Sequence, residues 1–174
     1  MNVILLLLLC FFTGIVVKFS DYLEDKKGKK SHILIRIFYG IVYGVILFYT
    51  MYKFNFIIPL WMGIIFGLIF SRKIDAPAHY AGVLVSFTLF FIFKLSFQSV
   101  LLLFLFTGLC IMEEWLNDFA DKLKNNKIRK IVSVRPILEI SALLVGIFSG
   151  NIFIWLALLF HDIGYVTIAS VFEK

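Results

Sequence analysis

Long apolar runs separated by short polar segments extend along the whole chain. The hydrocarbon core of a bilayer is about 30 Å thick, so a helix that crosses it needs roughly 20 apolar residues, with about 17 as the lower limit. The runs that approach or reach this length cover residues 2–18, 33–52, 54–71, 79–95, 97–116, 131–149 and 151–172. The pattern predicts about seven membrane-spanning helices with short connections, and six spans is the alternative.

The composition supports the same fold class. Hydrophobic residues make up 61% of the 174 residues and charged residues 16%, whereas a soluble domain is about 45–50% apolar and about 25% charged. We therefore expect an all-α, polytopic integral membrane bundle in which residues 1–174 form a single transmembrane domain. The composition also excludes a nucleic-acid-binding protein, although the net charge is +6. In a membrane protein the basic residues lie in the loops between the spans, and the positive charge is interpreted by its position there.

The basic residues fall mainly on one side of this arrangement. Lys and Arg in short loops resist translocation, so loops that are rich in them stay in the cytoplasm. Most of them lie in or beside the first, third and fifth loops: Lys26, Lys27, Lys29, Lys30, Arg72, Lys73, Lys122, Lys124, Lys127, Arg129, Lys130 and Arg135. The sequence predicts a cell-membrane protein with its N-terminus outside and its C-terminus and acidic loops in the cytoplasm.

Two acidic clusters lie in the predicted cytoplasmic loops. Asp21 and Asp25 are four residues apart, so they share a helix face, and a run of lysines follows them. Asn117, Asp118 and Asp121 end the fifth apolar run. Three basic residues follow this second cluster: Lys127, Arg129 and Arg135. Carboxylates bind Mg²⁺ and basic side chains bind phosphate, so the clusters suit a Mg²⁺-bound diphosphate; solvated loops that bind anionic lipid headgroups are the competing interpretation.

The two clusters also resemble each other in sequence. SDYLEDK begins at residue 20 and NDFADK at residue 117, and each follows a span that would end in the cytoplasm. Residues 1–72 and 97–172 would then be parallel three-helix repeats, related by an axis along the membrane normal. Chance similarity between short hydrophobic segments is the alternative.

The second cluster resembles the N-D-x-x-D signature and trailing R-x-x-R-P-like segment of the UbiA-type intramembrane prenyltransferases. The matching residues are Asn117, Asp118, Asp121, Arg129, Arg135 and Pro136. The first cluster is similar to that family's other acidic motif, D-x-x-x-D, through Asp21 and Asp25, with the two motifs in reverse order. The resemblance implies a helical bundle that binds a polyprenyl diphosphate through Mg²⁺ and transfers the prenyl group to an acceptor.

A diphosphate site of this kind gives each residue a role. Asn117, Asp118 and Asp121 would hold one Mg²⁺. Asp21 and Asp25 would hold a second, and the four aspartates are the catalytic candidates. The residues that would bind phosphate and stabilise the departing diphosphate are Lys127, Arg129 and Arg135. The leading hypothesis is a Mg-dependent transferase at the cytoplasmic face, with a polyprenyl diphosphate or another phospholipid as its substrate.

Three ionisable residues inside the last two apolar runs support a different function. Glu139 lies in the sixth run, and His161 and Asp162 are neighbours in the seventh. Ionisable groups inside a span mark ion or proton pathways, so these residues predict a small ion- or proton-coupled transporter; a plain interhelical hydrogen bond is the other interpretation. A non-catalytic membrane subunit is the third hypothesis.

The third loop holds a secondary candidate pair, Asp75 and His79. The pair could bind a metal or act as an acid–base pair. Pro77 stands between the two residues, however, and an Asp75 side chain that caps the following helix is the simpler interpretation.

Overall fold

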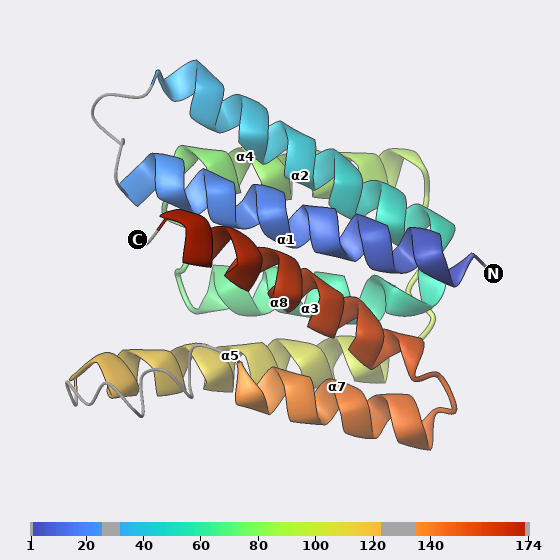
Figure 1. Cartoon of the computed structure of the whole chain (residues 1–174). Coiled ribbons are helices and arrows are strands. Elements are labelled where there is room, and N and C mark those ends of the chain that lie inside the picture. Colours follow the sequence, from blue (N-terminus) through green and yellow to red (C-terminus); the bar gives the residue numbers. More distant parts are fainter. Residues whose placement is uncertain (1, 26–31, 123–134, 173–174) are drawn as a thin grey trace. The chain divides into compact units, whose positions relative to one another are not determined.

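The computed structural model describes residues 2–25, 32–122 and 135–172, apart from the side chains of Asp25 and Asp121. All regular structure in these residues is helical (Figure 1). The helices are α1 (Val3–Asp25), α2 (Ile33–Lys53), the short 3₁₀ helix η1 (Asn55–Ile57), α3 (Ile58–Phe70), α4 (Pro77–Ile92), α5 (Val100–Lys122), α7 (Pro136–Phe148) and α8 (Phe153–Phe172). The prediction of an all-α fold is confirmed for this part of the chain.

Helix length separates two groups of apolar helices. Within the described segments, four helices are long and apolar enough to cross a membrane, and they lie in α1, α2, α5 and α8. Three further apolar helices have 10–17 residues: Asn55–Phe70, Pro77–Ile92 and Pro136–Phe148. Four such helices are compatible with a membrane protein, and spans formed by the three shorter helices stay a prediction.

Proline and glycine set the limits of the shorter helices. Pro77 and Pro136 occupy the first turns of α4 and α7, where the missing N–H is not needed and the fixed φ suits a helix. Gly150 follows α7 with a φ of 67°, a left-handed conformation that glycine adopts without steric cost. The helix α7 is therefore shorter than the predicted span 131–149.

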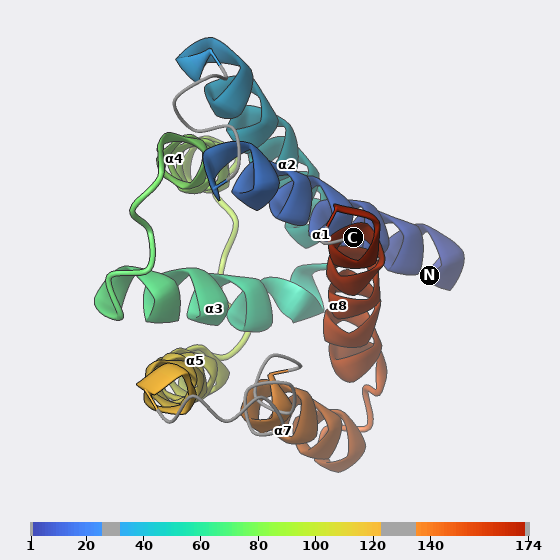
Figure 2. The same cartoon turned by 60° about the vertical axis from the view of Figure 1, so that its left-hand side comes forward.

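The chain folds into two compact units. Unit 1 comprises Met1–Asn55, Ile74–Ser96 and Leu159–Lys174, and so holds α1, α2, α4 and most of α8. Unit 2 comprises Phe56–Lys73 and Phe97–Leu158, and so holds α3, α5, α7 and the start of α8 (Figure 2). The two predicted repeats, residues 1–72 and 97–172, stay a prediction.

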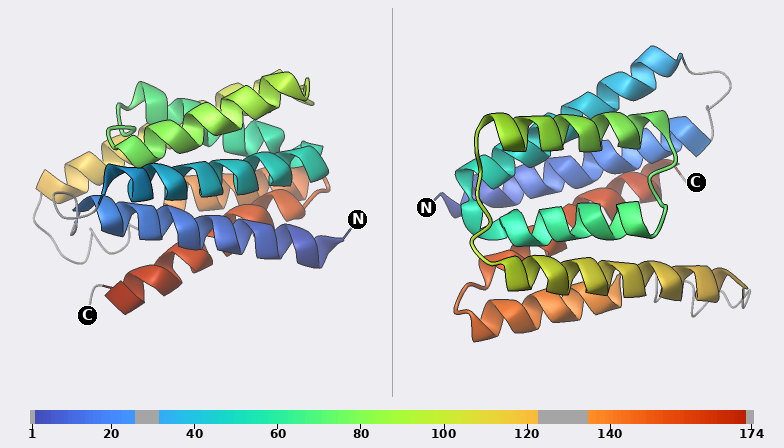
Figure 3. Two further views of the ribbon diagram at one scale, coloured as in Figure 1. Left: turned by 90° about the horizontal axis from the view of Figure 1, so that it is seen from above. Right: turned by 180° about the vertical axis from the view of Figure 1, so that it is seen from behind.

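In unit 1, small residues bring α2 and α4 into backbone contact (Figure 3). A side chain at Gly40 would collide with the backbone of Ala78, and one at Gly44 would collide with the backbone of Gly82. Ser86 Oγ donates a hydrogen bond to the Gly44 carbonyl at 3.1 Å. Small residues four positions apart, with a hydroxyl that bonds across the interface, are typical of helix pairs in membranes.

The helices α1 and α8 meet in unit 1 by a similar close approach. A side chain at Gly14 would collide with the backbone of His161, and one at Gly164 would collide with the backbone of Phe11. The end of α1, which carries polar residues, therefore packs against the second half of α8.

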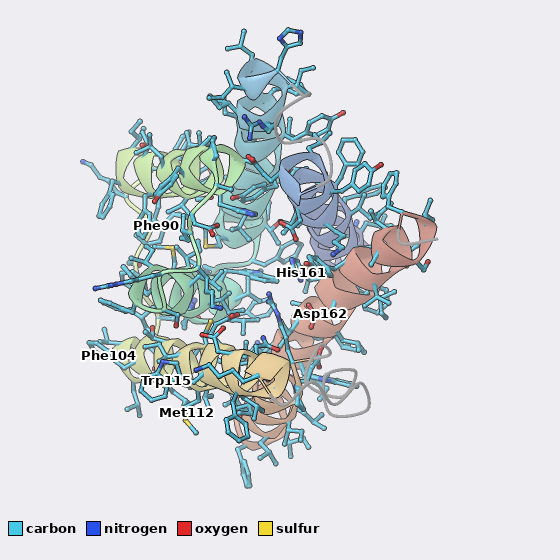
Figure 4. The ribbon with its side chains drawn as sticks, turned by 90° about the vertical axis from the view of Figure 1, so that its left-hand side faces the viewer. Phe90, Phe104, Met112, Trp115, His161 and Asp162 are labelled. Carbon is cyan, nitrogen blue, oxygen red and sulfur yellow. The ribbon has the colours of Figure 1, made fainter. Side chains whose placement is uncertain are left out.

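In unit 2, α3 packs on α5 through Gly63 and Gly67, which face Phe106 and Cys110. The thiol of Cys110 lies 3.6 Å from a backbone carbonyl of α3. The opposite face of α5 is also apolar, with the exposed side chains Phe104, Met112 and Trp115 (Figure 4). A helix that is apolar both in its core contacts and on its exposed face suits a lipid environment.

Candidate functional site

The last two turns of α1 carry carboxylates that contact two other helices of unit 1. Asp21 Oδ2 accepts a hydrogen bond from Tyr165 Oη of α8 at 2.7 Å. Asp21 Oδ1 lies 3.0 Å from His79 Nε2, in the first turn of α4. Residues that are far apart in the sequence therefore meet at one carboxylate. We call the polar residues gathered here the α1–α4 cluster: Asp21, Glu24, Arg36, Tyr43, His79 and Tyr165.

The imidazole of His79 has a polar neighbour at each ring nitrogen. Its Nε2 faces Asp21, and its Nδ1 lies 3.5 Å from Tyr43 Oη of α2. The Tyr43 hydroxyl is also within 3.2 Å of the His79 carbonyl. The side chains of His79 and Asp21 are 22% and 20% exposed, so a ligand can approach them, whereas Tyr43 is buried. A carboxylate, an imidazole and a hydroxyl in series can pass a proton.

Glu24, one turn after Asp21, holds the beginning of α4. Its Oε1 accepts a hydrogen bond from the backbone N–H of Ala78 at 3.2 Å, and its Oε2 forms an ion pair with Arg36 of α2. The first N–H groups of a helix have no partner within the helix and attract negative charge. Glu24 of α1 therefore provides the hydrogen-bond acceptor for the first turn of α4. A capping residue at the start of the same helix normally provides this acceptor.

This contact corrects one interpretation of the sequence. The N-cap residue of α4 is Ala76, without a side-chain capping bond, so Asp75 lies next to the N-cap at a helix start, as expected, but its side chain does not cap the helix. Asp75 is exposed, and the described partner of His79 is Asp21. The sequence paired His79 with Asp75 because the two residues are close in the chain. In the structure, the carboxylate that contacts His79 is Asp21 of α1.

Unit 2 has a second carboxylate at a helix N-terminus. Glu113 of α5 is fully buried, and its Oε2 accepts a hydrogen bond from the backbone N–H of Leu138 in the first turn of α7 at 2.9 Å. Its Oε1 has no hydrogen-bond partner among the described residues. Arg135, directly before α7, adopts a φ of 50°. Glu113 connects α5 to α7 as Glu24 connects α1 to α4.

The other predicted residues of unit 2 lie near the end of α5 or in α7. Asp118 forms an exposed ion pair with Lys73. Asn117 is half-buried. Glu139 Oε2 accepts a hydrogen bond from Trp155 Nε1 at 2.7 Å. These contacts give Asp118 and Glu139 defined partners inside unit 2.

His161 and Asp162 form a contact of their own in α8. The Nδ1 atom of His161 lies 2.9 Å from Asp162 Oδ1 (Figure 4). Both residues are near the middle of this 20-residue helix, and His161 is buried. The third residue of the predicted intramembrane site, Glu139, belongs to unit 2; a site that joins all three stays a prediction.

The predicted Mg²⁺ and diphosphate site is only partly described. The following lie outside the described residues or side chains: Asp25, Asp121, Lys127 and Arg129. Asp21 belongs to unit 1 and Asp118 to unit 2. Within residues 2–25, 32–122 and 135–172, no group of three or more His, Cys, Asp or Glu gathers as metal ligands do. The Mg²⁺ and diphosphate site therefore stays a prediction.

Sequence reasoning missed several members of the α1–α4 cluster. Glu24 carries the same charge as its neighbours and reads as a balance for the loop lysines. Tyr43 and Tyr165 read as interfacial anchors, because tyrosine is common at the membrane surface. The one usable signal was the spacing of Asp21 and Glu24, which places both on one face of α1. No signal in the sequence assigned their partners on α2, α4 and α8.

Comparisons with family models, with curated proteins and with solved structures find no match to this chain. The class of the protein therefore follows from the structure itself. It is an all-helical chain, within the described residues, with four helices that are long and apolar enough for a bilayer.

Proposed function

We propose that this chain is a multi-pass membrane protein with seven spans and that the α1–α4 cluster is the acid–base site of an enzyme that acts on the polar end of a membrane lipid. The observation that carries the proposal is the meeting of Asp21, His79 and Tyr165 from three helices. Ionisable residues that are grouped and partly accessible in an otherwise apolar protein favour a functional role.

The position of the cluster along the helices favours an enzyme of the interface. Asp21 lies four residues before the end of α1, and His79 is the third residue of α4. Helix ends lie at the level of the lipid headgroups, whereas transporter sites usually lie near the midplane of the bilayer. The basic residues of the first loop favour a cytoplasmic position for this end of unit 1.

His79 is the proposed acid–base group. The carboxylate of Asp21 fixes the orientation of the ring. A protonated His79 can donate its proton to a leaving oxygen of the substrate, and the neutral ring can accept one. A phosphate-bearing lipid is the proposed substrate class, because the four lysines that follow α1 attract anionic headgroups.

The resemblance to UbiA-type prenyltransferases gives this proposal a narrower form, in which the lipid is a polyprenyl diphosphate held by Mg²⁺. This form requires the acidic residues at the ends of α1 and α5 to act together. Both oxygens of Asp21 already have partners, Tyr165 and His79. We therefore assign no step to Mg²⁺, and treat its requirement as an outcome of the experiment.

The experiment measures the thermal midpoint of the purified protein with a polyprenyl monophosphate and a polyprenyl diphosphate, each with and without Mg²⁺. A ligand that binds only the folded state raises the midpoint. We expect a rise in the wild type that is largely lost in His79→Gln and retained in the control Asp75→Asn. Asp75 is exposed and close in sequence, so the control removes a nearby charge and leaves the cluster intact.

Each outcome has a clear meaning. No rise with either lipid under either condition would contradict the proposed substrate class. A rise with the diphosphate that needs Mg²⁺ and disappears in Asp118→Ala would support the prenyltransferase form. A rise that is equal in wild type and His79→Gln would place binding elsewhere and contradict the assignment of the α1–α4 cluster.

A second candidate function is supported by the His161–Asp162 pair. The pair lies near the middle of α8, at the depth expected for a proton or ion site. The test is proton uptake into vesicles that contain the protein and a pH-sensitive dye. Uptake that is lost in Asp162→Asn and in Glu139→Gln, and kept in His79→Gln, would favour the transporter over the enzyme.

A further inference from the structure

The first turn of α4 is held from α1 at two adjacent residues. The Oε1 atom of Glu24 accepts the backbone N–H of Ala78 at 3.2 Å. The side chain of the next residue, His79, is 3.0 Å from Asp21. Because one peptide bond joins Ala78 to His79, the contact made by Glu24 fixes the backbone from which the imidazole projects.

The helix α2 holds Glu24 from the other side. Arg36 forms an ion pair with Oε2 of Glu24, the oxygen that does not bind α4. The side chains of Arg36 and Glu24 are only 16% and 11% exposed, so water competes poorly for the pair. Tyr43, two turns after Arg36, lies with its hydroxyl 3.4 Å from the Ala78 carbonyl. The start of α4 is thus held between α1 and α2.

We infer that Glu24, anchored by Arg36, is a positioning residue that keeps the His79 ring at hydrogen-bond distance from Asp21. The inference rests on the proposed function, in which His79 is the acid–base group. Glu24 does not meet the ring or a substrate itself; it acts through the backbone of Ala78. A misplacement of about 1 Å at such a group can lower a reaction rate about 100-fold, which gives a positioning residue its effect.

The test follows the ring of His79 directly and does not need the substrate. The chain has three histidines, so the side-chain nitrogen and carbon signals of labelled histidine can be assigned with His79→Gln and His161→Gln. The charged and titratable groups that face or approach His79 are Asp21 and Glu24 of α1, Tyr43 of α2, Asp75 before α4, and Arg36 through Glu24.

Three variants separate position from charge. Glu24→Gln keeps an oxygen for the Ala78 N–H and loses the charge, Glu24→Ala loses both, and Asp75→Ala removes a nearby charge without touching α4. We expect Glu24→Ala to change the His79 signals and their titration midpoint strongly, with Glu24→Gln close to the wild type in its signals. Asp75→Ala should shift only the midpoint, and His161 should be unchanged in every variant.

The inference is overturned if Glu24→Ala leaves the His79 signals and titration as in the wild type, or if Glu24→Gln changes them as much as Glu24→Ala does. If Glu24→Ala does not fold, Arg36→Gln is measured instead, because it leaves the Ala78 contact and removes the anchor. An intermediate change at His79 in Arg36→Gln supports the inference, and no change contradicts it. These results are independent of the lipid-induced midpoint, so a failure of the proposed function and a failure of this inference are distinct.

Discussion

Both units of the molecule contain a glutamate that reaches from a long helix to the start of a helix that begins with proline. In unit 1, Glu24 of α1 accepts the N–H of Ala78, and in unit 2, Glu113 of α5 accepts the N–H of Leu138. The chemistry is the same in both cases, because a carboxylate satisfies an N–H group that the helix leaves without a partner.

The surroundings of the two glutamates differ. Glu24 is slightly exposed, uses its second oxygen for Arg36, and is followed along α4 by the ring of His79. Glu113 is fully buried, and its second oxygen has no partner among the described residues. One kind of structural contact therefore serves two purposes in this chain. In unit 2 it stabilises the packing of α7 on α5, and in unit 1 it also places a group that can transfer protons.

The largest effect is expected at Glu113. In Glu113→Ala the buried N–H of Leu138 loses its acceptor and a cavity forms, so we expect a loss of about 3 kcal/mol in the free energy of unfolding. The measurement is reversible unfolding in mixed micelles by titration with a denaturing detergent. Glu113→Gln keeps an oxygen for Leu138 and should lose about 1 kcal/mol. Equal losses in the two variants would mean that the charge, and not the contact with α7, stabilises unit 2.

A smaller loss is expected at Glu24. Glu24→Ala removes the acceptor of the Ala78 N–H, so it should cost about 1 kcal/mol, as the loss of an ordinary capping residue does. The same unfolding titration measures it. A loss as large as that of Glu113→Ala would mean that Glu24 is primarily a structural residue, which would remove the difference between the two units.

The pair formed by Asp21 and His79 should give a coupling that is smaller still. A double-mutant cycle with Asp21→Ala and His79→Ala isolates their interaction, and we expect about 0.5–1 kcal/mol for a hydrogen bond between partly exposed groups. Tyr165→Phe is the control, since it removes the other partner of Asp21 and leaves His79 in place. A coupling of zero would mean that the contact does not persist in solution.

Much of the fold could be predicted from the sequence. Apolar runs of the right length marked every helix from α1 to α8 that the structure describes, because helix formation in such runs depends on local composition. The limits were less accurate. Proline and the left-handed Gly150 shorten α7 relative to its apolar run, and apolarity alone does not register these backbone effects.

The candidate site could be predicted only in part. Asp21 and His79 were both named as candidates, but with other partners, since Asp25 and Asp75 are their neighbours in the sequence. The actual contact depends on the packing of α1 against α4, which is set by tertiary contacts and has no local signal. Glu24 and Glu113 were missed for the same reason: their partners are backbone N–H groups, and any residue carries one.

The smallest effect is expected at the ion pair between Lys73 and Asp118 in unit 2. Their side chains are 35% and 52% exposed, so solvent and salt weaken the attraction, and Asp118→Asn should change the free energy of unfolding by less than about 0.5 kcal/mol. The unfolding titration with denaturing detergent, carried out at low and high salt, measures this change in free energy, with Lys73→Met as the matched variant. An exposed acid that adds so little stability is free to serve another purpose, such as the Mg²⁺ binding that the sequence resemblance implies. A loss above about 1 kcal/mol in both variants would instead make the pair a structural contact of unit 2, and would leave the α1–α4 cluster of unit 1 as the better place to look for chemistry.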